Sequence, residues 1–196
     1  MLNQNKDLNV PNLLTCSRIA LAFIFSFLLF MDGFWAKFFA LVTFLVASFT
    51  DYLDGYIARK EGSVTNFGKL MDPIADKMLT LSAFIGFSIM KILPIWMVIL
   101  IIVRDFLITG LRLRMPEGSS SQEARVSGKQ KTALQFAAIV LILIYIMLRE
   151  ATFWKFEWEQ PVLSGVFILM LFIVAVTLWS GLRYIFMNRK MLNRSV

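Results

Sequence analysis

Long runs of uncharged, mostly apolar residues alternate with short polar segments along the chain. Six runs contain no charged residue: 19–31, 38–50, 78–90, 92–103, 132–148 and 160–182. Only the last exceeds the roughly 18 residues that identify a membrane span by length alone. Too few polar residues remain, however, to give six such runs a water-facing shell. The pattern therefore predicts an all-α integral membrane fold of six transmembrane helices, whose polar halves face protein or a water-filled cavity.

Turn-forming residues set the expected ends of these helices. Residues 9–12 predict a turn or interfacial segment before the first helix, and residues 61–63 end the second, with a glycine as the C-terminal cap. Pro94 begins the fourth helix. The Ser-rich stretch 117–127 predicts a loop, so that the fifth helix is expected to begin near Gly128.

Composition and the distribution of positive charge predict the topology. The chain is 58% hydrophobic and only 17% charged, whereas soluble domains are about a quarter charged. Lysines and arginines gather in alternate connections, while the other connections carry only Lys37, Lys91, Arg149 and Lys155. The positive-inside rule then places both termini on the cytoplasmic side. We expect a bacterial-type inner membrane, with a polar active-site cavity that faces the cytoplasm. We expect one membrane domain over 1–196, with an N-terminal interfacial segment at 1–12 and a basic cytoplasmic tail at 189–196.

The residues that the chain lacks exclude several kinds of chemistry. It has no histidine and a single cysteine, Cys16, which excludes intrachain disulfides, zinc sites of the His/Cys type and histidine as a catalytic base. The net charge of +7 suits anionic lipid headgroups or a phosphorylated substrate. Nucleic acid is not expected as a partner, because no basic soluble domain is present. The polar start of the chain has no basic n-region, so no secretory signal peptide is expected.

Four aspartates interrupt the apolar pattern within the stretch 51–76, DYLDGYIARKEGSVTNFGKLMDPIAD. Asp51 and Asp54 are three residues apart and share one face of a helix. Asp72 and Asp76 are four residues apart and share one face of the next helix. A turn between the two helices brings the two carboxylate pairs together across a cleft.

Carboxylates in such surroundings have to be neutralised by protons or by metal ions. Ligands that are all oxygen favour the hard cations Mg²⁺, Mn²⁺ or Ca²⁺. Two ions bridged by shared carboxylates suit a pyrophosphate substrate. Gly55, Ala58 and Gly68 leave room for a ligand beside the backbone, and Arg59 supplies a cation for phosphate. A single aspartate pair is more often a helix cap, but all four with these neighbours on common faces favour a ligand site.

The stretch resembles the signature of the CDP-alcohol phosphotransferase family, D-x2-D-G-x2-A-R-x8-G-x3-D-x3-D, with every spacing kept from Asp51 to Asp76. The resemblance implies a six-helix membrane fold, usually a homodimer, in which an alcohol attacks the β-phosphorus of a CDP-linked lipid and CMP leaves. Carried over from the family, Asp51, Asp54 and Asp72 are chiefly ligands of two Mg²⁺ or Mn²⁺ ions. Asp76 is then the general base on the alcohol and also contacts metal. A hydroxyl needs such a base, and no Ser/His or Cys/His pair is available for a covalent intermediate.

The resemblance also implies which residues bind the CDP group. It assigns the shape of the CDP site to Asp54, Gly55, Ala58, Arg59 and Gly68. Asn12 and Thr15, with Arg18, are candidates for the cytidine end of the site. Asn12 and Thr15 have an alternative interpretation as caps of the first helix.

A second group of cations bears on the acceptor alcohol. Arg104 follows the fourth apolar run, and Arg112 lies eight residues later on roughly the same helix face. Lys129 and Lys131 precede the fifth run in SGKQKTALQ. Because an arginine within a membrane span is a functional candidate, we expect these four cations to bind a phosphate of the acceptor. The two lysines have an alternative interpretation as ordinary cytoplasmic-side residues.

The order of NVPNLLTCSR, VRDFLITGLR and SGKQKTALQ is similar to that in family members that transfer the phosphatidyl group of CDP-diacylglycerol to glycerol 3-phosphate. This resemblance runs from Pro11 to about Gln135, and the last two runs contribute only hydrophobicity. An alternative in the same family is a cardiolipin synthase, whose acceptor is phosphatidylglycerol. A remote alternative is a divalent-cation transporter that uses the carboxylates as an ion path, but it would require neither Arg59 nor the small residues.

Overall fold

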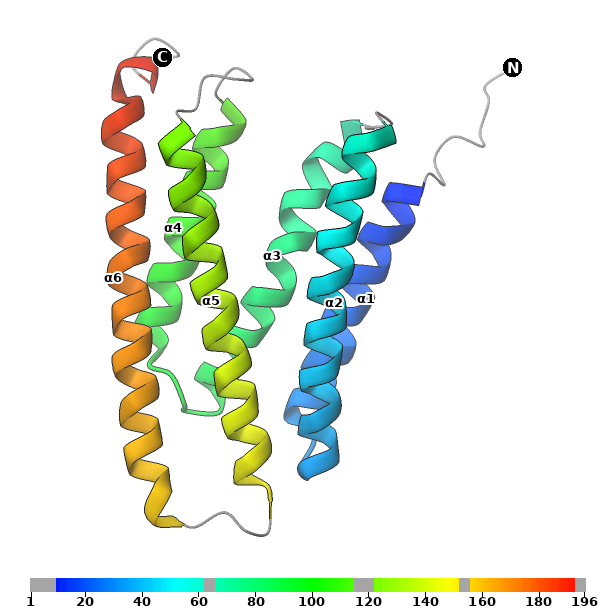
Figure 1. The fold of residues 1–196 in the computed structure, drawn as a ribbon, viewed down its shortest axis with the longest axis vertical. Helices are drawn as coiled ribbons and strands as arrows, with labels where there is room; N and C mark the ends of the chain where they lie inside the picture. Colours follow the sequence, from blue (N-terminus) through cyan, green and yellow to red (C-terminus); the bar gives the residue numbers. More distant parts are fainter. Residues whose placement is uncertain (1–9, 62–65, 115–121, 152–155, 193–196) are drawn as a thin grey trace. The chain divides into compact units, whose positions relative to one another are not determined.

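The computed structural model describes the backbone of residues 10–61, 66–114, 122–151 and 156–192, and the side chains of 17–50, 77–111, 131–151 and 157–187. Within these ranges the chain is helical, with no strand (Figure 1). The helices are α1 (Val10–Phe30), α2 (Phe34–Glu61), α3 (Asn66–Ile89), α4 (Ile95–Arg114), α5 (Gln122–Arg149) and α6 (Glu159–Leu192), with the short 3-10 helix η2 (Phe156–Trp158) before α6. The chain divides into two compact units. The first comprises residues 1–86 and 143–154, and the second residues 87–142 and 155–196.

In the first unit, α1 and α2 pack side by side as an antiparallel pair (Figure 1). The reversal between them uses Gly33, whose φ of 100° is in the region that favours glycine. The rings of Phe25 and Phe44 meet at the centre of the pair, with centroids 5.6 Å apart, and both side chains are fully buried. Lys37 closes the end of α1, because its ammonium donates hydrogen bonds to the carbonyls of Leu29 (2.8 Å) and Met31 (2.6 Å).

Within the same unit, α3 packs closely against α1 at a glycine. A Cβ at Gly86 would collide with the side chain of Leu29, which is itself fully buried. Because Gly86 has no side chain, α3 and α1 can lie this close together.

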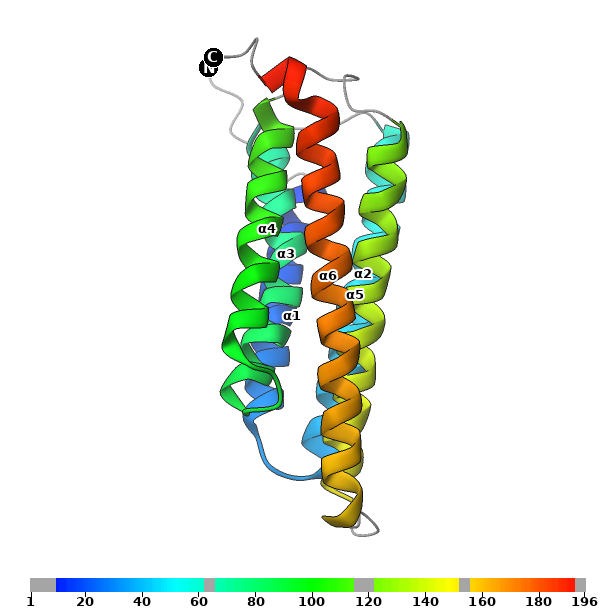
Figure 2. The same cartoon turned by 90° about the vertical axis from the view of Figure 1, so that its left-hand side faces the viewer.

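In the second unit, α4 packs against α6 (Figure 2). The core contains the buried side chains of Met97, Ile101, Met170 and Ile173. Charged side chains are also buried in this unit, among them Asp105 and Lys131.

Many large apolar side chains point outward from the helices. Phe27 is 69% exposed and Trp179 72% exposed, as are many other large apolar side chains of the described helices. In the part of the chain that the structure describes, two helical stretches are long and apolar enough to cross a membrane, Lys131–Arg149 and Glu159–Met187. Shorter apolar helices span Ser17–Phe30, Phe34–Thr50 and Lys77–Ile89. This is the pattern expected of a membrane protein.

The helix ends agree with most of the sequence-based boundaries and correct three of them. Helix α1 begins at Val10, so the end of the predicted turn is helical, and Pro11 is tolerated because the first helical turn needs no amide donor. Helix α5 begins at Gln122, not near Gly128, because Gln122 to Arg125 are good helix formers although the stretch is polar. Helix α6 continues to Leu192, into the predicted basic tail.

Candidate active site

The four aspartates of the signature lie on two consecutive helices of the first unit. Asp51 and Asp54 belong to the last three turns of α2, and Asp72 and Asp76 to the first three turns of α3. Both stretches are continuous helix, so the predicted sharing of a helix face within each pair holds for the backbone. The side chains of residues 51–76 lie outside the described ones.

The backbone also sets the depth of each aspartate. Asp51 is ten residues before the end of α2, and Asp76 is ten residues after the start of α3. At the helical rise, each lies about 15 Å along its helix from the connection between them. Asp54 and Asp72 lie seven and six residues from the same ends. The two helices are antiparallel and extend to the same side of this connection (Figure 1), so the aspartates lie at two matching levels, Asp51 with Asp76 and Asp54 with Asp72.

The chemistry of this donor set fits a hard divalent cation. All four donors are carboxylates, and oxygen ligands without nitrogen or sulfur are typical of Mg²⁺ and Mn²⁺ sites. Among the described side chains, no other group of three or more His, Cys, Asp or Glu residues is placed to hold a metal ion. Asp51, Asp54, Asp72 and Asp76 thus have the donor chemistry that suits such a cation.

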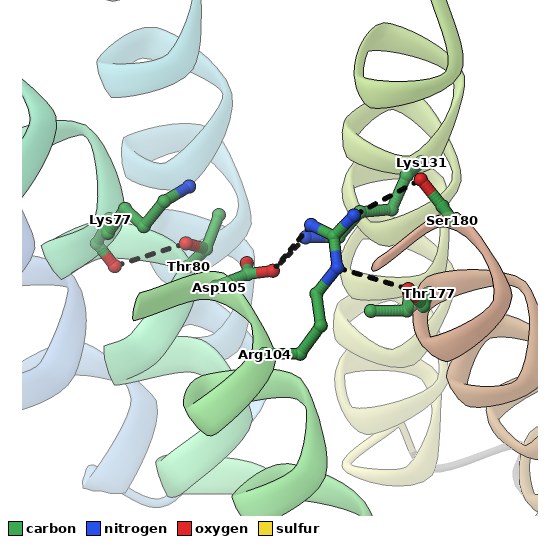
Figure 3. Close-up of polar contacts among 7 residues, drawn as sticks. All are labelled: Lys77, Thr80, Arg104, Asp105, Lys131, Thr177 and Ser180. Atoms are coloured by element: carbon green, nitrogen blue, oxygen red, sulfur yellow. Dashed lines mark hydrogen bonds and ion pairs between the residues drawn. The ribbon is translucent and has the colours of Figure 1, made fainter. Parts of the chain in front are cut away.

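Three charged side chains meet in the interior of the second unit, and we call Arg104, Asp105 and Lys131 the buried ion cluster (Figure 3). Arg104 and Asp105 come from α4 and Lys131 from α5. One carboxylate oxygen of Asp105 accepts from Arg104 Nη1 at 3.3 Å and also from the Lys131 ammonium. The exposed fractions of the three side chains are 12%, 9% and 4%. The cluster keeps a net charge of +1 inside the protein.

Helix α6 supplies the remaining partners of Arg104. Arg104 Nε donates to the Thr177 carbonyl at 3.0 Å, and Nη2 donates to Ser180 Oγ at 3.1 Å (Figure 3). A Cβ at Gly181 would lie only 3.1 Å from Arg104 Nε and 3.2 Å from its Cγ. Gly181 thus makes room for the arginine, so α6 contributes both hydrogen-bond partners and space to the buried ion cluster.

Two buried polar atoms near this cluster have no hydrogen-bond partner among the described residues. They are Gln135 Nε2, whose residue is 4% exposed, and Thr177 Oγ1, whose residue is 1% exposed. Gln135 lies one helical turn after Lys131 on α5 and therefore on the same face. A buried amide without a partner is costly, so this face is suited to a polar ligand.

The structure brings together two of the four predicted acceptor cations, Arg104 and Lys131, through Asp105. The side chains of Arg112 and Lys129 lie outside the described ones. Sequence reasoning assigned no role to Asp105, Thr177, Ser180 and Gly181. The signal for Asp105 was its position beside Arg104 at the end of an apolar run, since a charge in such a run needs a partner.

The predicted residues for the cytidine end lie on α1. Asn12 and Thr15 are inside the helix, which begins at Val10, so their interpretation as helix caps is wrong. Their side chains lie outside the described ones. Arg18, one turn further along, is buried with 6% of its surface exposed.

Comparison with known proteins adds an independent line of information. The model of the CDP-alcohol phosphatidyltransferase family matches residues 8–187. A Bacillus subtilis (strain 168) protein named CDP-diacylglycerol–glycerol-3-phosphate 3-phosphatidyltransferase is 40% identical over 149 residues, which cover 70% of this chain and 77% of that protein. Proteins of the same name are similar in Shigella flexneri serotype 5b (33% over 185 residues, 90% and 93%) and Rickettsia bellii (37% over 143 residues, 70% and 76%). With the signature on α2 and α3 and a family match over most of its length, this chain belongs to the CDP-alcohol phosphatidyltransferase family.

Proposed function

We propose that this protein transfers the phosphatidyl group of CDP-diacylglycerol to glycerol 3-phosphate, giving phosphatidylglycerophosphate and CMP. The observation that carries the proposal is the complete aspartate signature at matching levels of two consecutive helices, in a chain whose relatives bear the name of that activity. Asp51, Asp54 and Asp72 are chiefly metal ligands, and Gly55, Ala58, Arg59 and Gly68 shape the CDP site with Asp54.

Bound divalent ions, two Mg²⁺ or Mn²⁺ in our proposal, would neutralise the pyrophosphate oxygens and make CMP a better leaving group. The carboxylates of α2 and α3 supply the negative charge that retains such ions. Asn12 and Thr15, on the first turns of α1, are proposed for the cytidine end of the donor.

Asp76 performs the proton transfer in this proposal. A glycerol hydroxyl is a weak nucleophile at neutral pH, and a carboxylate within hydrogen-bond reach removes its proton as the new bond forms. The hydroxyl oxygen bonds to the β-phosphorus, the bond from that phosphorus to the CMP oxygen breaks, and the proton moves to Asp76. No histidine is present to serve as base instead.

Arg104, Arg112, Lys129 and Lys131 bind the phosphate of the acceptor in this proposal. Support comes from the buried ion cluster, whose three side chains carry two positive formal charges and one negative charge, because buried positive charge favours an anion. The unpartnered amide of Gln135 supplies a further donor on the Lys131 face of α5. Asp105 and α6 orient Arg104, and Asp105 orients Lys131.

We further propose the arrangement in the membrane. Six helices cross a bacterial-type inner membrane, both termini lie in the cytoplasm, and the active site faces the cytoplasm. The chain 1–196 forms one membrane domain and works as a homodimer. Support comes from the positive-inside distribution of lysine and arginine and from the apolar outer faces of the helices.

The test is CMP release by the purified protein from CDP-diacylglycerol with Mg²⁺ or Mn²⁺. Release that requires glycerol 3-phosphate is expected, and activity with phosphatidylglycerol alone would instead identify a cardiolipin synthase. Asp76→Asn should lower kcat by a factor of 10²–10⁴, the usual contribution of a general base. Asp32→Asn makes the same chemical change at an exposed carboxylate and should leave kcat unchanged. An unchanged kcat in Asp76→Asn would refute the base assignment.

A further inference from the structure

Helix α3 ends in a turn that places a lysine where glycine is usual. The amide of Lys91 donates to the Ser88 carbonyl at 3.0 Å, and the amide of Ile92 donates to the Phe87 carbonyl at 2.9 Å. This pair of bonds is the Schellman motif, whose penultimate residue takes a left-handed conformation and is usually glycine. Lys91 has a φ of 60°, the only positive φ among the described residues other than glycine.

The turn itself does not account for this lysine. Its carbonyls are already bonded by backbone amides, and no described residue accepts a hydrogen bond from the Lys91 ammonium. The backbone of Lys91 is kept in a conformation that non-glycine residues disfavour, and its side chain has no partner in the turn, which points to a role outside the turn.

A groove lies beside this turn in the second unit, between the connection from α3 to α4 and the start of α6. Its volume is about 680 Å³, within the range of ligand-binding pockets. Ile95, Phe167 and Ile168 give it an apolar wall, and Ser88 and Ser164 add hydroxyl groups. Lys91 is the only charged residue of its lining.

The lining of this groove is amphipathic. A cation and hydroxyls lie together with apolar residues from α4 and α6, two helices whose outer faces are rich in exposed apolar side chains. The carboxylates of Glu157 and Glu159 precede the lining stretch of α6, which begins at Leu163. One negative charge attached to a long apolar chain is the ligand that complements this groove.

We propose that the groove binds an anionic phospholipid, with its phosphate at Lys91, Ser88 and Ser164 and an acyl chain along Ile95, Phe167 and Ile168. The site is separate from the candidate acceptor residues, because Ile95 precedes Arg104 by nine residues on α4, about 14 Å along the helix. The proposal of this lipid site does not rest on the proposed function.

The test measures how strongly the purified protein retains single lipids, by native mass spectrometry with phosphatidylserine and phosphatidylcholine, neither of which is a substrate in the proposed reaction. The unaltered protein should prefer phosphatidylserine by about fivefold, the factor that one interfacial cation contributes. Lys91→Gln should abolish the preference and Lys91→Arg should keep it. Ser164→Phe fills the groove and should weaken binding of both lipids.

Two further variants separate lipid binding from a structural or general charge effect. Lys91→Gly suits the left-handed turn, so it should unfold at the same temperature or higher while losing the lipid preference. Arg149→Gln removes one positive charge from another connection of the same predicted side and should keep the preference. The proposal is overturned if Lys91→Gln retains the preference, or if Arg149→Gln loses it equally.

Discussion

The buried ion cluster allows a quantitative prediction, because its three charges are not equivalent. At the 3.3 Å that separates Arg104 Nη1 from Asp105 Oδ1, the attraction is about 5 kcal/mol for an effective dielectric constant of 20. Desolvation of each ion costs several kcal/mol and roughly cancels that gain. The stability of the cluster therefore depends on its charge balance, which changes differently with each substitution.

Asp105→Asn removes the carboxylate that Arg104 and Lys131 share and should lower the free energy of unfolding by about 3–5 kcal/mol. Lys131→Met leaves the neutral pair of Arg104 and Asp105, so its effect should stay within about 1 kcal/mol. In the double variant Arg104 keeps its hydrogen bonds to the Thr177 carbonyl and to Ser180 Oγ of α6. Removal of Lys131 should thus recover about 1–2 kcal/mol of the loss caused by Asp105→Asn.

The measurement is equilibrium unfolding, followed by circular dichroism as the mole fraction of a denaturing detergent is raised. Asp32→Asn serves as the control, because it makes the same chemical change at an exposed carboxylate. If Lys131→Met destabilises the protein as much as Asp105→Asn, or if the double variant shows the sum of the two losses, the charge-balance argument is wrong.

Three other predictions follow from the packing and the donor set. Gly181→Ala should lower the free energy of unfolding by about 1–3 kcal/mol, because the added Cβ lies 3.1 Å from Arg104 Nε. Gly165→Ala on the same helix is the control: its Cβ has no atom within 4 Å, so the same detergent titration should show no loss. Lys37→Met removes two hydrogen bonds to the end of α1 and should lower the unfolding free energy by about 2–3 kcal/mol; no loss would show that the ammonium does not stabilise α1. Chelation of divalent cations should abolish CMP release, and added Mg²⁺ or Mn²⁺ should restore it, while activity that survives chelation would exclude the metal proposal.

The helices could be predicted from the sequence because charge-free runs have to be helical in a membrane. The end of α2 at Glu61 was located because a polar segment with glycine follows it. The start of α5 at Gln122 was not predicted, because the first residues of this helix are not apolar. That stretch is polar, and its helical conformation depends on intrinsic propensity, which hydrophobic patterning does not detect.

The two helices that carry the aspartate signature were predictable because its residues are close in sequence. The spacing from Asp51 to Asp76 is carried by two consecutive helices, so local geometry is sufficient. The α6 partners of Arg104 are 73 and 76 residues away, at Thr177 and Ser180. One of them is a backbone carbonyl, which leaves no sign in the amino-acid sequence. Such contacts become visible only when α4 and α6 are placed in space.

The bond from Arg104 to the Thr177 carbonyl has a consequence for how distant relatives are compared. A main-chain acceptor is available whichever residue occupies position 177. The side chain at this position can therefore differ between relatives while the arginine keeps this contact. Position 181 has no such freedom, since any Cβ there approaches the Arg104 side chain. In alignments of weakly similar chains, a glycine in the second half of the last apolar segment is therefore a better landmark for α6 than its hydrophobic residues.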